Sequence, residues 1–424
     1  MLIMFKVKNF TSFKDEAKLD MRATAYKQHP SHLLTTPEGK KLIKTAAIYG
    51  ANASGKSNFI SAMYFFENYI FDQFISKSDS ASQGLVEDVI TSKFEAYQLT
   101  DNITKASEFE IIFTYNGKTF QYGFECTSEE VINEWYYIDD YKVYERNGDH
   151  VDIGSKYGKY IKDFKKTPKK RLYLSVLEYF LDEKEKNIIL SDFIAFFRTE
   201  YDVFLELFFD STVKQIANLI RINKRLVKNK TFREKVESYL KQVDVGIKGL
   251  KVVEENVVND RTGKSEKRKT LRTIHDVYDI DGNICGQKDF ELSKESTGTL
   301  RFLSYIQEVV EMTERGGVFV VDEISARLHP LLTKLIIDIF QSSNNTKAQF
   351  IFTTHDVSLL NKDQFRRDEV VFVDKNSKGE SSLYSLSDLK VRDDASFNKD
   401  YLQGKYGAIP IFDYDILLDG DKIG

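Results

Sequence analysis

Cysteine and proline are both scarce in this sequence of 424 residues, which has two and five of them. Two cysteines, Cys126 and Cys285, are too few for a disulfide framework or a four-ligand zinc site, and they fit a reducing compartment. An excess of one charge is also missing, because 61 Lys and Arg face 65 Asp and Glu, for a net charge of −4. The overall charge therefore predicts no general affinity for polyanions, although it leaves room for local basic patches.

A membrane-spanning run and a secretory signal are lacking as well. The most apolar stretch, residues 59–75, is interrupted by Glu67, Asn68 and Asp72, which favours a buried helix over a membrane span. The first ten residues show neither the apolar core nor the cleavage site of a signal peptide. We therefore expect a cytoplasmic protein with no membrane association.

Aromatic residues, by contrast, are abundant. The chain is 42% hydrophobic and 13% aromatic, with 32 Phe and 23 Tyr, so it has ample surface to bury and disorder is excluded. At the usual ~100–200 residues per domain, the length predicts two or three core-forming units.

Strand patterns dominate the first 150 residues. Residues 2–21 read as two short strands, and residues 46–49 as a short buried strand. Residues 108–124 form the clearest hairpin pattern, with Asn116-Gly117 at its turn, and further strands follow through Tyr144.

The rest of the chain shows two further patterns, first helical and then alternating between strands and helices. Residues 176–241 contain no Gly or Pro and predict helices, but no heptad persists, so a long coiled-coil arm is not expected. The segments that follow predict strands at 249–254 and 273–278, then helices at about 297–315 and 330–341 and strands at 318–321, 349–353 and 369–373. This final alternation indicates an α/β fold with a parallel sheet.

The strongest motif is Gly50-Ala-Asn-Ala-Ser-Gly-Lys-Ser57, which matches the pattern G-x-x-x-x-G-K-[ST] in full. It follows a predicted strand and precedes a predicted helix, where backbone N–H groups can curl around a phosphate. We expect Lys56 to reach the β- and γ-phosphates of a nucleotide and Ser57 to bind Mg²⁺. The predicted nucleotide-binding residues are Gly50, Asn52, Ala53, Ser54, Gly55, Lys56, Ser57 and Asn58.

Two later strands end in residues suited to phosphate chemistry. The apolar run 318–321 is followed by Asp322 and Glu323, a weak signal alone that becomes strong beside the motif at 50–57. Asp322 is predicted to hold the Mg²⁺ shell through water, and Glu323 to orient or deprotonate an attacking water. The next apolar strand ends in His355; a lone histidine is usually packed or solvated, but this position favours contact with the γ-phosphate.

A fourth element lies upstream of the Asp322 strand. Ser296 and Gly298 stand at the start of a predicted helix, where they offer hydroxyl and N–H donors to a phosphate oxygen. Taken alone they would be read as a helix N-cap. Their position just before the acidic strand favours the phosphate-binding interpretation.

These four elements, in this order, resemble the ABC-type ATPase heads of the SMC, RecF and OLD superfamily rather than ring-forming AAA+ machines. More closely, the chain is similar to the compact ABC-type ATPases of bacterial abortive-infection and anti-phage systems, of the RloA, AbiLi and PARIS type. Residues 5–13, 322–330 and 386–410 add to this resemblance. It implies an α/β ATPase head with a mixed or parallel core sheet, flanking helices, an antiparallel N-terminal sheet and a helical insertion.

The resemblance also implies a division of the chain. Residues 1–150 would form the N-terminal half of the head with the P-loop and the antiparallel sheet. Residues 151–248 would form a mainly helical insertion, a short arm or lid, and residues 249–424 the C-terminal half with the remaining motifs.

The ligands implied by the resemblance are ATP and Mg²⁺, shared within a dimer or a larger homo-oligomer. The P-loop of one protomer would be closed by the Ser296–Gly298 segment of the other, with Arg327 across the interface. Two positions depart from the family. Thr11 stands where a basic residue is common, and the glutamine that links Mg²⁺ to the arms is not evident; Gln98 is one candidate and otherwise a plain loop residue.

Positive charge is concentrated in residues 214–235, where eight Lys or Arg face one acidic residue. Three interpretations stay open: the segment follows a nucleic-acid backbone, it docks an acidic partner such as a phage protein, or it is a solvated helical face balanced by the acidic stretch 178–210. Smaller basic clusters occur at 162–171 and 264–272.

Relatives of the OLD type append a Toprim nuclease, but the chain after His355, including Asp413-Tyr-Asp415, is too short for one. The first hypothesis is therefore an ATPase that acts as sensor and scaffold in anti-phage defence and controls a separate, Toprim-like nuclease. The alternatives are a DNA-repair ATPase of the RecF or SMC type and a nucleotide-gated adaptor with little turnover. The intact Glu323 speaks against the adaptor.

Overall fold

The computed structural model describes residues 1–75, 94–101, 106–161, 167–204, 220, 223–258, 265–325, 328–392 and 394–410. Arg327 and Asp413–Asp415, singled out from the sequence, lie outside these ranges, as do the side chains of residues 72–75.

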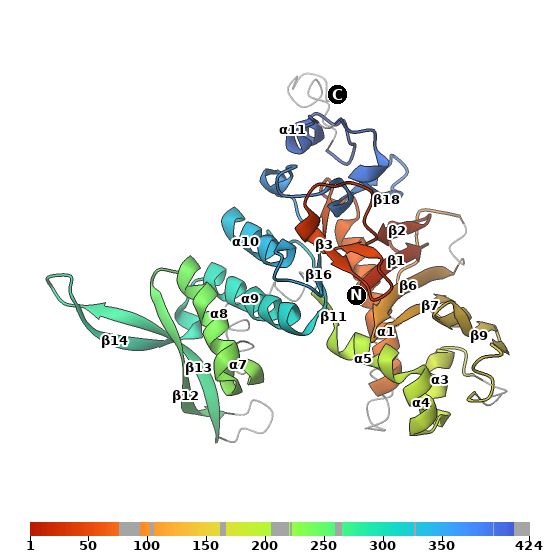
Figure 1. Cartoon of the computed structure of the whole chain (residues 1–424), viewed down its shortest axis with the longest axis horizontal. Helices are drawn as coiled ribbons and strands as arrows, with labels where there is room; N and C mark the ends of the chain where they lie inside the picture. The colour runs from red at the N-terminus through yellow and green to blue at the C-terminus, as the bar shows by residue number, and fades with distance from the viewer. Residues whose placement is uncertain are drawn as a thin grey trace, which may run out of the picture.

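An antiparallel sheet of seven strands forms one side of the body (Figure 1). Its order is β10-β9-β8-β7-β6-β1-β2. The first strand of the chain therefore pairs with one strand that precedes the P-loop in the sequence, β2, and with one that follows it, β6. The strands are β1 (Leu2–Lys8), β2 (Ala17–Asp20), β6 (Ser107–Tyr115), β7 (Lys118–Cys126), β8 (Val131–Ile138), β9 (Tyr141–Asn147) and β10 (His150–Ile153). The predicted hairpin at Asn116-Gly117 is confirmed, because β6 and β7 pair from Ser107 and Cys126 to Tyr115 and Lys118.

A second sheet of six strands has the order β11-β15-β16-β5-β17-β18. All neighbours are parallel except the edge strand β18. Its strands are β5 (Thr45–Tyr49), β11 (Tyr201–Phe204), β15 (Gly317–Val321), β16 (Ala348–Thr353), β17 (Val370–Lys375) and β18 (Ser381–Ser385), and a small hairpin pairs β3 (Leu33–Thr35) with β4 (Lys41–Ile43). The predicted α/β fold with a mixed core sheet and an antiparallel N-terminal sheet is confirmed.

Alternation along the strands divides the interior into two cores. On β5, Ala46 and Ile48 belong to the core that contains α1 (Lys56–Ile75) and the seven-stranded sheet. Ala47 and Tyr49 belong to the core on the opposite face, because successive side chains of a strand point to opposite faces. The helices of this opposite side include α9 (Thr297–Arg315) and α10 (Pro330–Gln341).

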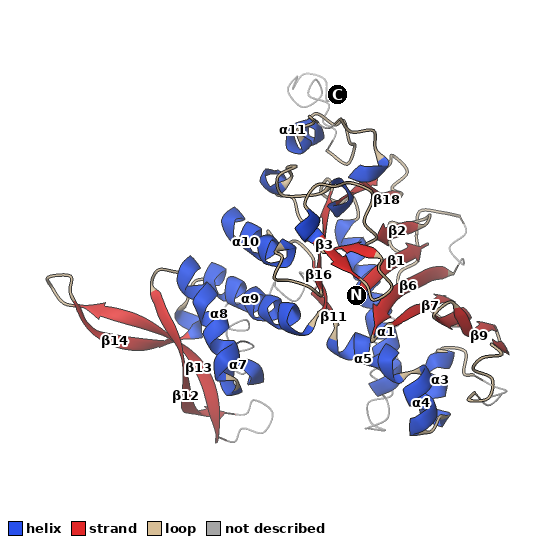
Figure 2. Cartoon of the chain, in the orientation of Figure 1, coloured by secondary structure: helices blue, strands red, loops and turns tan. Residues whose placement is uncertain are grey.

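A three-stranded antiparallel sheet projects from the body beside α8 (Figure 2). We call this sheet the arm; it consists of β12 (Ile247–Val258), β13 (Ser265–Tyr278) and β14 (Ile284–Glu291). The remaining helices are α3 (Tyr173–Phe180), α4 (Glu183–Ile189), α5 (Ser191–Thr199), α7 (Lys224–Lys228), α8 (Lys230–Val243) and α11 (Phe397–Leu402). Among the described helices, none is both long and apolar enough to cross a bilayer.

Two segments differ from the sequence-based expectation. The stretch 176–241, predicted as helix throughout, contains the strand β11, which pairs in parallel with β15 at the edge of the core sheet. A strand of four residues is too short to show a periodicity that separates it from helix. The strand β14 was also not predicted, because its side chains are mostly exposed and show no apolar alternation.

Candidate functional site

Three parallel neighbours of the core sheet, β15, β16 and β5, end at one edge and bring the predicted site together there. The P-loop follows β5, the residues Asp322 and Glu323 follow β15, and His355 follows β16. Since ligands of open α/β sheets bind outside the carboxyl ends of the strands, this edge is the candidate nucleotide site.

The P-loop backbone is curled in a way that needs its glycines. A Cβ on Gly50 would lie 2.3 Å from the Val373 carbonyl oxygen, and one on Gly55 would lie 2.5 Å from the Ser381 hydroxyl. Gly55 also has a φ of 116°, and Ala53 has a left-handed φ of 61°. The loop therefore takes a tight, strained conformation, of the kind that turns backbone N–H groups toward an anion.

Lys56 begins α1 and folds back over the loop. Its side chain is 4% exposed, and Nζ donates hydrogen bonds to the carbonyl oxygens of Gly50 and Ala51, both at 3.0 Å. Burial lowers the pKa of Lys56 to about 8, although the negative charges of Glu323 and Asp322 act to raise it. The ammonium group is thus held at the loop, where phosphate oxygens would replace its carbonyl partners.

Asp322 and Ser57 meet at the end of β15. Ser57 hydrogen-bonds to the Asp322 carboxylate, which also accepts a hydrogen bond from Thr353 Oγ1 at 2.5 Å. Asp322 is only 5% exposed, and this burial is the main cause of its raised pKa. A hydroxyl and a carboxylate oxygen beside a phosphate-binding loop are the donors that Mg²⁺ takes, so these residues fit the ion.

Glu323 and His355 form a second pair. His355 Nε2 lies 2.9 Å from Glu323 Oε1, and both side chains are partly exposed. Glu323 has a φ of 51°, unusual for a residue with a side chain, and its N–H donates to Thr353 Oγ1 at 2.7 Å. The hydrogen bond from His355 lowers the pKa of Glu323, which keeps the carboxylate charged.

Ser296 and Gly298 lie elsewhere, at the start of α9. Ser296 Oγ accepts the Thr299 N–H at 3.0 Å, and Thr299 Oγ1 donates to Asp244, the residue after α8, at 2.8 Å. Ser296 is exposed. Among the described residues, no hydrogen bond links this segment to the P-loop of the same chain, so within one protomer it forms an N-cap.

Gln98 shows no link to the Ser57–Asp322 pair. It is exposed, and its side-chain amide donates to the Ala96 carbonyl oxygen at 3.1 Å. No hydrogen bond within the described part of the chain joins it to Ser57 or Asp322. Its role as a metal contact stays a prediction.

Part of the positive charge in the described basic segment is paired within the chain. Arg225 pairs with Glu311 at 2.8 Å and with Glu314 at 2.9 Å, and Lys235 also pairs with Glu314. These partners lie on α9, not in the acidic stretch 178–210 that the interpretation as a solvated helical face invoked. Lys214 and Arg221 lie outside the described residues.

Hydroxyl groups from distant segments form hydrogen bonds that hold the P-loop in place. Ser381 Oγ lies 2.8 Å from Ser12 Oγ and donates to the Ser54 carbonyl oxygen at 2.6 Å. Asn58 Nδ2 donates to Ser12 Oγ at 2.7 Å. Ser12 lies in the segment 5–13 that carries part of the family resemblance, but no local motif marks Ser381 or Thr353.

Comparisons with known proteins bear on this arrangement. The sequence matches the family model described as "AAA domain, putative AbiEii toxin, Type IV TA system" over residues 46–361. No curated protein matches it. A structure of an SMC head bound to the C-terminal winged-helix domain of ScpA is 12% identical, covers 95% of this chain and 99% of that chain, and has a TM-score of 0.45. An SMC head domain from Thermotoga maritima is 16% identical, with coverages of 92% and 99% and a TM-score of 0.43.

Proposed function

The chain belongs to the AAA domain family whose model it matches, and on that premise we propose that it binds and hydrolyses ATP as an ABC-type ATPase. The observation that carries the proposal is a convergence at the ends of three neighbouring parallel strands. Lys56 lies after β5, Asp322 and Glu323 lie after β15, and His355 lies after β16. The electrostatic influence of both carboxylates on Lys56 supports their closeness to the P-loop.

Each residue of the site has a separate task in this proposal. The P-loop N–H groups and Lys56 bind the phosphates, while Ser57 and Asp322 would hold Mg²⁺, which when bound neutralises phosphate charge. Glu323 orients the attacking water and accepts its proton. His355 fixes the Glu323 carboxylate through their 2.9 Å contact and is proposed to contact the γ-phosphate.

We further propose that two protomers share each ATP. Ser296 and the first turn of α9 expose a hydroxyl and N–H groups that no P-loop of the same chain uses. The N-terminus of a helix attracts anions, and α9 has 19 residues. The γ-phosphate on a second protomer is therefore the proposed partner of this segment.

At the cellular level, we propose a cytoplasmic sensor and scaffold subunit of a bacterial anti-phage system that controls a separate, Toprim-like nuclease. The resemblance of residues 5–13, 322–330 and 386–410 to abortive-infection ATPases supports this role. The pairing of Arg225 and Lys235 with α9 carboxylates favours it over the DNA-repair alternative, because it leaves less positive charge for a phosphate backbone.

The Glu323→Gln variant tests the enzymatic part. It should bind ATP with nearly unchanged affinity but lose turnover by about 10²-fold or more, because a general base is removed and the P-loop is kept. Phosphate release and calorimetric ATP binding measure the two effects separately. The matched control is Asp281→Asn, which removes an exposed carboxylate from the loop after β13 and should leave both unchanged. Equal turnover in both variants would refute the assignment of Glu323.

A further inference from the structure

The seven-stranded sheet has an outer face that points away from the core with α1. On β7, Phe120, Tyr122 and Phe124 are buried in that core, whereas Gln121 and Glu125 point outward and are partly exposed. The outer face is defined here by Glu108, Glu110, Gln121, Glu125, Asn133, Trp135, Glu145 and Asp152. Toward β1 this face is covered by an apolar cluster formed with the β3–β4 hairpin, but across β7 to β10 it is polar and partly exposed.

Negative charge gathers on the outer face. Glu108 of β6 stands directly opposite Glu125 of β7 in the strand register, a like-charge pairing that destabilises a sheet. Lys6 is shared by Glu108 at 2.7 Å and Glu110 at 3.7 Å. Among the described residues no cation pairs with Glu125, whose carboxylate contacts the Asn133 amide.

The same imbalance recurs on the outer strands. Lys142 is shared by Glu145 and Asp152. Among the described residues, Lys6 and Lys142 thus pair with four of the five carboxylates across β6 to β10, and Glu125 has no paired cation. Two further cations lie nearby: Lys8 stands opposite Glu108 in the strand register, and Arg146 of β9 pairs with the buried Glu134. A cationic partner would satisfy the remaining charge.

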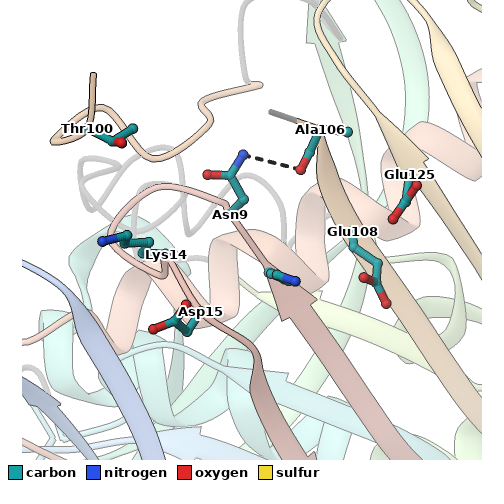
Figure 3. Close-up of a pocket in the computed structure, with 8 residues that line it drawn as sticks. Asn9, Lys14, Asp15, Thr100, Ala106, Glu108 and Glu125 are labelled. Atoms are coloured by element: carbon teal, nitrogen blue, oxygen red, sulfur yellow. Dashed lines mark hydrogen bonds between the residues drawn. The ribbon is translucent and has the colours of Figure 1, made fainter. Parts of the chain in front are cut away.

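The face is hollowed as well as charged. Two adjoining hollows of about 410 and 630 Å³ share Glu108 and Glu125. Figure 3 shows these two side chains on neighbouring strands, with Lys14 and Asp15 across the first hollow. Lys8 and Lys14 line the first hollow but not the second, and Lys14 is paired with Glu380 at 2.7 Å. Negative charge therefore predominates on the side of Glu108 and Glu125 that faces the second hollow.

Trp135, the single tryptophan of the chain, lies in the second hollow. Its ring rests on Gly123, where a Cβ would come within 2.4 Å of it. The indole N–H donates to Glu110 at 2.6 Å, which fixes the ring on the sheet. An aromatic ring held among carboxylates is a surface on which a guanidinium group both stacks and pairs.

We propose that the outer face docks a Lys/Arg-rich segment of a partner protein, with an arginine over Trp135 and cationic groups beside Glu108 and Glu125. The sign of the charge excludes a nucleic-acid backbone as the occupant. The proposal assigns an interaction surface and does not depend on the ATPase reaction.

The single tryptophan provides a local readout of this surface. The full-length protein is titrated with octa-arginine at about 0.15 M salt, where long-range attraction is screened within ~8 Å. We expect a saturable change in tryptophan emission and no change with octa-serine. In Glu108→Gln/Glu125→Gln, the dissociation constant should rise about tenfold, because two direct charge partners are lost.

The matched control removes the same charge elsewhere. Glu38→Gln/Asp281→Asn neutralises two exposed carboxylates outside the face and should change the dissociation constant less than about twofold. Thermal unfolding of each variant checks that it is folded, and labelled peptide anisotropy detects binding at any site. Absent binding, binding without a change in Trp135 emission, equal weakening in both double variants, or the same response to an oligonucleotide would each overturn the proposal.

Discussion

At the scale of single residues, the charged side chains near the P-loop differ in burial and in hydrogen-bond partners. Lys56 is buried against loop carbonyls, and Asp322 is buried against hydroxyls. Glu323 instead stays partly exposed and ionised through His355. In the proposed function, these differences assign Lys56 to phosphate, Asp322 to the metal ion and Glu323 to the attacking water.

The lowered pKa of Lys56 predicts a pH dependence of ATP binding. Phosphates bind the protonated amine, and this amine loses its proton at about pH 8 in the free protein. ATP affinity should therefore fall as the pH rises from 7 to 9, with proton uptake on binding. Calorimetry in two buffers of different ionisation enthalpy measures that uptake. Lys56→Gln should bind more weakly and lose the dependence, and a wild-type affinity that stays constant over this range would contradict the assignment.

At the scale of elements, the P-loop is held by pieces from both ends of the chain. The turn after β1 supplies Ser12, and β18 supplies Ser381, which bonds both Ser12 and the Ser54 carbonyl oxygen. The N–H of Ser381 also donates to the Ser12 carbonyl oxygen at 2.8 Å. The loop conformation thus depends on a contact between segments more than 360 residues apart.

Ser381→Ala should weaken ATP binding. It removes two hydrogen bonds and leaves the Ser54 carbonyl oxygen without that partner, a change of about 1–2 kcal/mol or roughly 5- to 30-fold in affinity. The comparison is Ser382→Ala, which alters an exposed serine of the same strand. ATP dissociation constants and melting temperatures measure both variants, and the same affinity in the two would show that Ser381 does not support the loop.

Sequence patterns reveal these elements unequally. The strands β5, β15 and β16 were predictable because short apolar runs end in Gly50, Asp322 and His355. The strand β11 was not, since four apolar-rich residues between helices carry no distinct period. The contacts of Ser381 escaped prediction for another reason: they are set by tertiary packing and have no local motif. The separation of Ser296 from its own P-loop likewise depends on the placement of α9.

At the scale of the whole molecule, the helices that follow the P-loop and Ser296 belong to different sides of the core sheet. The helix α1, which follows the P-loop, lies in the core with the seven-stranded sheet. The helix α9, which follows Ser296, lies in the opposite core, next to α8 and the arm (Figure 1). If both segments bind phosphate, as proposed, one protomer presents two incomplete halves of a site, and a second protomer is required to join them.

Light scattering of Glu323→Gln with and without ATP and Mg²⁺ tests this requirement most directly. The variant should stall hydrolysis and accumulate the closed form, so we predict that ATP raises the mass from the 49.1 kDa of one chain to at least twice that value. Ser296→Arg should abolish the rise, because the bulky cation blocks the donor segment, while Ser238→Arg on the exposed surface of α8 should not. A variant that binds ATP yet keeps the mass of a monomer, or an oligomer that forms without ATP, would contradict the account.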